Sequence, residues 1–338
     1  MRVSIVDVAN RAEVSISTVS RVLNRRDLVN AKTRERVEAA IRELGFRPNA
    51  FGRGLMLRRS EVVGLVLPDL HGDFYSEIIR GADAKARSMG YNLVVSSAAA
   101  GEDSHSLLER LQNRGLIDGV AVMISEVTED TERVLSGFRQ PVVLMDGVSP
   151  GDQHDSVVID QERGVQALAS HLLGKCGVRR VIFLGGCDTN ADTQARLAAW
   201  RRSLTKARLP LVDEDVYHLD YEFESACRLA ADRLDDWADP DTCVVAANDE
   251  MAAGVISAAH AAGVTVPDEL QVVGFDDTRL AKLIRPKLTT VRVPMWQMGA
   301  RAIELLCGRI QDEAKEPRRV SLPPALVVRD SCRANGVS

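Results

Sequence analysis

Carboxylate and amide side chains follow four apolar runs of the sequence, at the point where each run ends. They are Asp69 after VVGLVLP, Asp146 after PVVLM, Asn248-Asp249 after TCVVAA, and Asp276-Asp277 after LQVVGF. Such side chains hydrogen-bond to ligand hydroxyl and amine groups, and buried polar groups of this kind reject ligands that leave them unpaired. The pattern therefore indicates a binding site for a small polar molecule, provided that the fold brings the ends of these runs together.

The runs belong to an alternation of apolar strands and amphipathic helical stretches that begins near residue 61. One set of expected strands covers 62–69, 91–98, 117–124 and 141–147, and a second set covers 179–186, 215–220, 242–249 and 270–277. Strands that alternate with helices of roughly 12–16 residues predict parallel sheets covered on both faces. We therefore expect an α/β fold with two doubly wound subdomains, which bind a ligand in the crevice at the carboxyl ends of the strands.

The charge of the chain is distributed unevenly. The net charge is −5, but residues 1–60 carry 13 Lys+Arg and 6 Asp+Glu, whereas the remaining residues carry 30 and 42. A basic N-terminal segment on an acidic body indicates a segment that binds a polyanion. A solvated charged surface is the alternative that charge alone leaves open.

The first 47 residues predict a helix-turn-helix unit. Ile5, Val8, Ala9 and Ala12 have helical spacing, Ser15 is a candidate N-cap for a second helix, and a third helix is expected from Asn30 to Gly45. The second helix of such a unit enters the major groove of DNA with its N-terminal residues. Its outward side chains are Ile16, Ser17, Thr18 and Arg21, which suit contacts with base edges and thymine methyl groups. A small three-helix bundle for protein contacts is the alternative, and the basic charge favours DNA.

Motifs typical of catalysis are missing from the sequence. It contains no GxGxxG after the first strand, no GxxxxGK[ST], no HExxH and no GxSxG, and Gly185-Gly186 lacks the further glycine and lysine of a phosphate loop. The six histidines lack metal-ligand spacing, and we expect His71 to be an exposed loop residue. The six cysteines contain no CxxC pair and read as buried thiols in a reducing cytoplasm. We expect no enzymatic activity, no cofactor, no metal and no membrane partner.

Longer stretches carry a resemblance to a known family. The segments SIVDVANRAEVSISTVSRVLN, TRERVEAAIRELGFRPNA, AANDEMAAGVISAAHAAGVTVPDELQVVGFDD and RPKLTTVRVP occur in family order. Over about residues 3–331 the chain resembles the lactose/galactose repressor (LacI/GalR) family of bacterial transcription factors. The resemblance implies a DNA-binding head and a two-lobed core like that of periplasmic binding proteins. Glu13 departs from the family, which usually has glycine in this turn.

The resemblance also implies an effector site lined from both lobes of the core. Its residues would be Phe74, Tyr75, Asp146, Arg196, Tyr221, Asn248 and Asp276. Arginine, carboxylates and an amide suit a polyhydroxylated ligand, and aromatic rings suit its C–H face, so the expected effector is a sugar or a sugar derivative. Val293 stands where glutamine is common and HGDFY replaces an asparagine-proline-aromatic sequence, so a plain hexose is not the only candidate.

Each expected site residue has a structural alternative. Asn248 and Asp276 would then cap the following helices, Phe74 and Tyr221 would belong to the core, and Arg196 would pair with a carboxylate on a helix surface.

The family further implies a hinge that contacts the minor groove at the centre of the operator. In the segment RPNAFGRGLMLRRS, Leu55 occupies the position that wedges between base steps, and Ala50 and Arg53 face the groove. Gly52 and Gly54 weaken a helix there, so we expect order only on DNA.

The expected organisation is a head (1–47), a hinge (48–60) and a core (61–338). The first lobe would span about 61–160 and 292–322, and the second about 161–291 and 323–338. No C-terminal leucine heptad follows the last strand, so we expect a homodimer that binds double-stranded, near-palindromic operator DNA. A solute-binding protein with the same core is the alternative, and the DNA-binding head and the missing signal peptide disfavour it.

Overall fold

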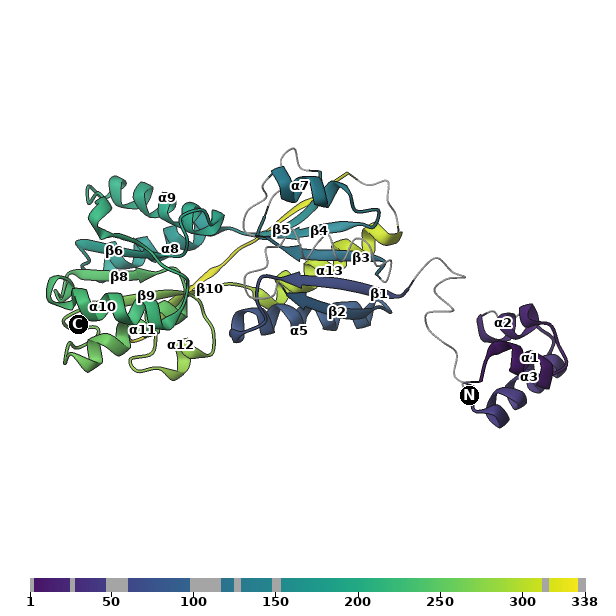
Figure 1. Ribbon diagram of the computed structural model, residues 1–338. Helices are drawn as coiled ribbons and strands as arrows, with labels where there is room; N and C mark the ends of the chain where they lie inside the picture. Colours follow the sequence, from purple (N-terminus) through teal and green to yellow (C-terminus); the bar gives the residue numbers. More distant parts are fainter. Residues whose placement is uncertain are drawn as a thin grey trace. The chain divides into compact units, whose positions relative to one another are not determined.

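The computed structural model describes residues 3–24, 28–46, 60–97, 117–124, 129–147, 153–311 and 316–333. The chain divides into two compact units, a head of residues Met1–Ser60 and a core of residues Glu61–Ser338. The described part of the head is helical, and the core contains two sheets with helices around each (Figure 1).

The head consists of three short helices around a small apolar core. They are α1 (Ile5–Arg11), α2 (Ile16–Asn24) and α3 (Ala31–Leu44). Each helix contributes one fully buried valine to this core; these are Val8, Val19 and Val37. The three predicted helices and their inward faces are therefore confirmed.

Side chains and one glycine define where these helices begin and end. Ser4 and Asp7 form a reciprocal capping box at the start of α1, and the Asn30 side chain accepts a 2.8 Å bond from the Thr33 amide at the start of α3. Gly45 ends α3 with φ 62°, a left-handed conformation that glycine adopts without steric cost.

The turn between α1 and α2 tolerates a residue other than glycine. Glu13 has φ 49°, the left-handed conformation expected for this position. Arg36 of α3 donates from Nη2 to the carbonyl oxygens of Ala12 at 2.6 Å and of Glu13 at 3.4 Å. These bonds pair turn carbonyls with a charged donor, and they offset a backbone cost of about 1 kcal/mol.

The first lobe of the core contains a six-stranded parallel sheet. Its strands, in spatial order, are β11 (Arg319–Leu322), β5 (Asp155–Ile159), β4 (Val142–Met145), β3 (Gly119–Met123), β1 (Val62–Leu67) and β2 (Asn92–Ser97). Helices α5 (Gly72–Ser88) and α13 (Met295–Gln311) cover one face, and α7 (Glu129–Ser136) packs on the other (Figure 1).

The second lobe repeats this plan with a mixed sheet. The order is β12 (Ala325–Val327), β10 (Thr289–Arg292), β9 (Gln271–Asp276), β8 (Thr242–Ala246), β6 (Arg180–Gly185) and β7 (Val216–His218). Helices α8 (Gln161–Lys175) and α9 (Ala191–Lys206) pack on one face, and α10 (Phe223–Trp237) and α11 (Asp249–Ala261) on the other. The short helices η2 (Asp213–Asp215) and α12 (Leu280–Leu283) lie in connections.

The structure corrects the expected sheets in two respects. The eight expected strands all form, but each sheet gains two further strands, which are β5, β10, β11 and β12. The sheets were expected to be parallel, whereas β12 runs antiparallel to β10, so the second sheet is mixed. An antiparallel strand at the edge of a parallel sheet is common in doubly wound folds.

The chain passes between the two lobes three times. It crosses after β5 into α8, after β10 into α13, and between β11 and β12. Since each lobe contains strands from distant parts of the sequence, neither lobe is a continuous chain segment. Three connections of the main chain therefore join the two lobes.

The cysteines are less uniformly buried than expected. Cys176, Cys243, Cys307 and Cys332 are buried, but Cys187 is exposed and Cys227 is partly exposed, and all six are free thiols. His171, Cys176 and Cys332 gather in one buried cluster, where Cys332 Sγ lies 3.5 Å from His171 Nε2 and 3.3 Å from Thr289 Oγ1. Sequence spacing did not reveal this cluster because it joins the end of α8 to the segment after β12.

Candidate functional site

The first turn of α2 presents a polar and apolar surface to solvent. Ile16 is 49 % exposed, Ser17 and Arg21 are also exposed, and Thr18 is half-buried. Ser15 Oγ accepts a 3.2 Å bond from the Thr18 amide and lies 2.8 Å from Ser17 Oγ, so it caps the helix as expected. The four predicted major-groove residues thus lie on the first two turns of one helix.

The predicted hinge residues cannot be placed in the same way. Ala50, Arg53 and Leu55 lie outside the residues that the structure describes. Their role in minor-groove binding stays a prediction.

A cavity of about 470 Å³ lies in the core at the carboxyl ends of strands from both sheets. All seven predicted effector residues line it: Phe74, Tyr75 and Asp146 from the first lobe, and Arg196, Tyr221, Asn248 and Asp276 from the second. Binding at this edge is expected for doubly wound folds, because the helices and loops that follow the strands meet there.

Arg196 is a buried residue of the cavity wall. Only 7 % of it is exposed; its Nε donates to Gln161 Oε1 at 2.9 Å and its Nη1 donates to the Ala247 carbonyl. The guanidinium carbon lies 4.0 Å from the centre of the Phe275 ring, a cation–π contact. The nearest carboxylate is Asp192, one turn earlier in α9, at 3.8 Å. The side chain is therefore held in one place, and the alternative of a surface ion pair is wrong.

Tyr221 is held in the cavity by an unusual backbone and by a neighbouring glycine. Its φ is 70°, and its hydroxyl donates to Asn190 Oδ1 at 3.1 Å and lies 2.7 Å from Thr193 Oγ1. A Cβ atom on Gly186 would lie 1.9 Å from the Tyr221 ring. Gly186 is therefore required by the close approach of this ring, which explains the Gly185-Gly186 pair after β6.

Asn248 uses its side chain mainly within the protein. Its Oδ1 accepts from the Met251 amide at 2.8 Å as the N-cap of α11, and its Nδ2 donates to the Tyr221 carbonyl at 2.8 Å. The capping alternative is therefore correct for Asn248. The same two bonds also fix the backbone of Tyr221, and one N–H of the amide is left for a ligand.

Phe74 and Tyr75 lie in the first turn of α5 and line the cavity from the first lobe. Their rings meet edge to face, with centroids 5.3 Å apart at 89°. Burial, followed by the nearby charge of Asp146, raises the pKa of Tyr75. Its hydroxyl is consequently neutral and able to donate a hydrogen bond.

Asp146 and Asp276 provide carboxylates without internal partners. Neither side chain has a hydrogen-bond donor among the described residues, although Asp276 is only 8 % exposed. Burial raises the pKa of both well above its ordinary value; the charge of Asp192 raises both further, and Arg196 opposes the rise. The capping alternative fails for Asp276, because α12 begins only at Leu280.

Three cavity residues share strained backbone geometry. Asp146, Tyr221 and Asp276 have φ values of 63°, 70° and 113°, where side chains other than glycine are unfavourable. Such strain persists only where the surroundings enforce it, and it concentrates at functional sites. At Asp276 the enforcing contact includes a 3.2 Å bond from the Val293 amide to the Asp276 carbonyl.

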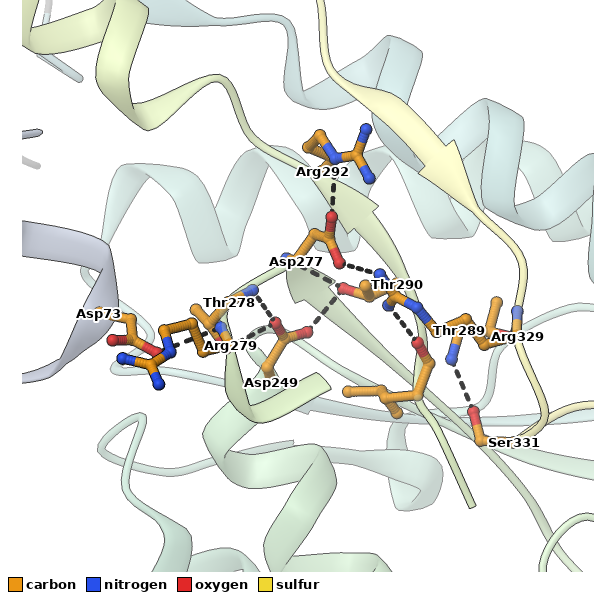
Figure 2. Close-up of polar contacts among 11 residues, drawn as sticks. Asp73, Asp249, Asp277, Thr278, Arg279, Thr289, Thr290, Arg292, Arg329 and Ser331 are labelled. Atoms are coloured by element: carbon orange, nitrogen blue, oxygen red, sulfur yellow. Dashed lines mark hydrogen bonds and ion pairs between the residues drawn. The ribbon is translucent and has the colours of Figure 1, made fainter. Parts of the chain in front are cut away.

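Asp249 and Asp277 organise the segment that carries Asp276 (Figure 2). The fully buried Asp249 accepts from the Thr278 amide at 2.7 Å, from Thr278 Oγ1 at 3.0 Å and from Thr290 Oγ1 at 2.6 Å. Burial raises the pKa of Asp249 to about 7, against the lowering effect of these three bonds.

Asp277 was expected at the cleft, and this expectation is wrong. Asp277 is not among the residues that line the cavity. Its carboxylate instead accepts hydrogen bonds from Arg292 Nε at 2.7 Å and from Arg329 (Figure 2). The backbone leaves the extended conformation here, with φ values of 113° at Asp276 and 57° at Asp277, and of the two residues only Asp276 lines the cavity.

Comparison with known proteins identifies the chain. Residues 4–49 match the model of bacterial regulatory proteins of the lacI family, and residues 169–332 match a periplasmic binding protein-like domain. The catabolite control protein A of Priestia megaterium is 34 % identical over 98 % of this chain and 100 % of its own length. The chain belongs to the lacI family.

Solved structures of the lacI family have the same fold. A lac repressor dimer bound to operator and the anti-inducer ONPF has a TM-score of 0.85 and 28 % identity, with 98 % of this chain and 99 % of that chain covered. A complex of the transcriptional regulator CelR with cellobiose has a TM-score of 0.73 and 30 % identity, with 98 % and 100 % covered.

As a member of the lacI family, this chain is a DNA-binding transcriptional regulator with an effector-binding core, and it is not an enzyme. This confirms the recognised family, the fold class and the absence of catalysis expected from the motifs. None of the helices within the described ranges is long and apolar enough to cross a membrane.

Sequence reasoning missed several acidic residues of this lacI-family cavity. Asp192, Glu250 and Asp73 line it beside the predicted residues. Asp192 lies four residues before Arg196, and helical spacing puts such residues on one face, so this signal was available. His71 has 93 % of its side chain exposed and bonds to Asp69 at 2.7 Å, as expected of a loop histidine at the cavity mouth.

Proposed function

We propose that this regulator is a homodimeric repressor whose operator affinity depends on a polyhydroxylated effector, a sugar or sugar derivative. The observation that carries the proposal is that all seven residues expected from the family resemblance line one and the same cavity of about 470 Å³. A cavity of this size matches small-molecule sites, which commonly have about 300–1,000 Å³.

In this proposal the head (1–47) reads one half of a near-palindromic operator. Ile16, Ser17, Thr18 and Arg21 contact base edges in the major groove. Arg21 is exposed and forms no ion pair with any described residue, so its guanidinium is available to a guanine edge. The hinge (48–60) inserts Leu55 between base steps from the minor groove, with Ala50 and Arg53 facing the groove, and the two heads of one dimer bind both operator halves.

The chemistry of the cavity favours a ligand with several hydroxyl groups. Asp146 and Asp276 accept hydrogen bonds, Tyr75 donates one, and Tyr221 and Phe74 offer aromatic faces to C–H groups. The related CelR structure holds cellobiose, which supports the carbohydrate class without fixing the sugar.

Effector binding and operator binding are coupled in this proposal because residues of both lobes line the cavity. A ligand that touches both lobes favours one relative orientation of the lobes, and the linkage between effector and operator binding is reciprocal. Whether the effector releases or promotes DNA binding depends on which orientation it prefers.

The proposal is tested by selecting operator sequences from random duplex DNA with the full-length chain. A thermal-unfolding screen of sugars, nucleosides and their phosphates then finds ligands, and fluorescence anisotropy measures operator Kd with each. We expect a near-palindromic site, Kd values that rise steeply with salt, and a polyhydroxylated ligand that changes Kd. Binding without sequence preference would contradict the DNA-reading role, and a nucleobase as the only effective ligand would contradict the carbohydrate class.

Two further measurements complete the test. Arg21→Ala should weaken operator binding by about 1–3 kcal/mol and relax specificity at one base position, whereas Arg42→Ala, exposed at the far end of α3, should have a smaller effect. Sedimentation of the free protein should give a dimer. A stable tetramer would contradict the proposed assembly.

A further inference from the structure

The effector cavity is strongly acidic. Of the 21 described residues that line it, nine are aspartate or glutamate, and Arg196 is the one arginine or lysine among them. This excess of negative charge goes beyond what hydrogen bonds to sugar hydroxyls need, because neutral amides and hydroxyls accept such bonds as well.

Some of these carboxylates are paired within the protein. Asp249 is bonded to Thr278 and Thr290, Asp69 to His71, and Asp73 to the backbone amide of Arg279. Their charges stabilise the fold and the cavity mouth.

Three other carboxylates that line the cavity have no hydrogen-bond donor within the part of the protein that the structure describes. Asp146, Asp192 and Asp276 come from the segment after β4, from α9 and from β9, and the described residues give none of them a hydrogen-bond donor. Asp276 is more than nine-tenths buried and lines the cavity. The charges of these three groups act on one another, since Asp192 and Asp146 both raise the pKa of Asp276.

Arg196 does not neutralise this group. Its Nε and Nη1 are engaged by Gln161 and the Ala247 carbonyl, its plane lies against Phe275, and Asp192 is 3.8 Å from its remaining nitrogen. One guanidinium thus faces three carboxylates. A carboxylate that is largely removed from water and has no hydrogen-bond donor is costly to ionise unless a positive charge lies beside it.

We infer that the effector supplies this cation: a polyhydroxylated ligand with a protonated amine that lies among Asp146, Asp192 and Asp276. An ammonium group donates three hydrogen bonds, which is one for each of the three carboxylates. The aromatic rings of Tyr221 and Phe74 on the same cavity favour a cation as well. Phosphorylated or carboxylated sugars are disfavoured, because nine of the lining residues are acidic and Arg196 is the one arginine or lysine beside them. The inference rests on the proposed function, in which this cavity is the effector site.

The direct test uses two probes of nearly the same shape. Tris(hydroxymethyl)aminomethane carries an ammonium where pentaerythritol carries a fourth hydroxymethyl group. Thermal unfolding of the full chain is measured with each probe at neutral pH and constant ionic strength. We expect the amine to raise Tm in a saturable manner and pentaerythritol to raise it much less. Equal shifts, or no shift with either probe, would overturn the inference.

Variants locate the effect in the cavity. Asp276→Asn and Asp192→Asn should each remove most of the preference for the amine, and each variant's own unfolding transition reports whether it folds. Asp232→Asn, on the exposed surface of α10, should keep the preference. A preference that survives both cavity substitutions would place the amine elsewhere and overturn the assignment.

A second series compares hexoses with their 2-amino-2-deoxy, N-acetylamino and 6-phosphate forms by calorimetry. For each scaffold that binds, we expect the amine to bind at least about tenfold more tightly than the parent, in line with one charge pair at a partly buried site. A neutral hexose that binds as tightly and shifts operator affinity would refute the inference and leave the proposed function standing. An amine that binds in the cavity without changing operator affinity would refute the proposed function instead.

Discussion

Asp73 in the first turn of α5 accepts a 3.1 Å hydrogen bond from the backbone amide of Arg279, which follows β9 in the opposite lobe (Figure 2). The two walls of the cavity are thereby joined beside the residues that line it. On one side α5 also carries Phe74 and Tyr75, and on the other the segment after β9 carries Thr278. This bond is a contact that lobe opening would break.

Asp73→Ala should weaken binding of cavity ligands several-fold, because the closed arrangement of the lobes loses a bond. The effect on Tm should be small, since a partly exposed hydrogen bond contributes only about 1 kcal/mol. Calorimetry with the first ligand found in the screen measures the change. Asp83→Ala removes a carboxylate from the same helix that pairs with Arg87 away from the cavity, and equal losses in both variants would argue against a role for the lobe contact.

Gly186→Ala should disrupt the cavity by displacing Tyr221, whose ring would lie 1.9 Å from the new Cβ atom. We expect ligand affinity to fall at least about tenfold and Tm to drop. Gly174→Ala is the matched control, because its Cβ would meet nothing within 4 Å in the last turn of α8. That substitution should be neutral or stabilise the protein by up to about 1 kcal/mol. Similar ligand affinity in the two variants would show that Tyr221 is not part of the site.

Asp277→Asn should reduce the free energy of unfolding by about 1–3 kcal/mol, because it leaves the largely buried Arg329 and the exposed Arg292 without their buried carboxylate. Chemical denaturation measures the loss. Asp232→Asn on exposed α10 provides a control that should change stability by less than about 0.5 kcal/mol. If both variants unfold at the same denaturant concentration, the two arginine contacts do not support the segment after β9.

The raised pKa of Asp276 predicts a specific pH dependence. Burial keeps a proton on the folded carboxyl at pH values where the unfolded chain has lost it, so stability falls as pH rises above about 4 toward the raised pKa. Asp249, with its pKa raised to about 7, contributes in the same direction. Asp276→Asn cannot titrate, so its free energy of unfolding should fall less between acidic and neutral pH than that of the wild type.

Denaturation of both proteins across this pH range, without ligand, checks the prediction. At neutral pH the variant should be at least as stable as the wild type, because a repelled carboxylate has been removed. A steeper decline in Asp276→Asn than in the wild type would contradict the assigned cause of the shift.

Local signals in the sequence predicted much of the fold. Ser15, Asn30 and Gly45 marked helix ends through side-chain and backbone chemistry that depends only on near neighbours. The eight expected strands were visible because buried parallel strands are continuous apolar runs. By contrast, β11 has four residues and β12 has three, and both are partly exposed. No continuous apolar run in the sequence therefore predicts them.

The site could be assembled only in part from the sequence. The ends of strands indicated Asp146 and Asp276, and the family resemblance added Arg196 and Tyr221. The apolar run before them did not distinguish Asp276 from Asp277, because the partners of Asp277 come from β10 and from the segment after β12; only the family resemblance named Asp276. Nor could the sequence show that the Asn248 side chain is hydrogen-bonded to the Met251 amide and the Tyr221 carbonyl, since both bonds depend on the path of the backbone.

Reciprocal linkage between operator and effector tests the central claim most directly. Operator Kd is measured with and without a saturating cavity ligand, for the wild type and for Asp276→Asn. The account predicts that the ligand changes wild-type operator Kd by about fivefold or more, and that DNA changes ligand affinity by the same factor. The variant should bind operator but lose the response. An operator Kd that is the same with and without bound ligand would contradict the account.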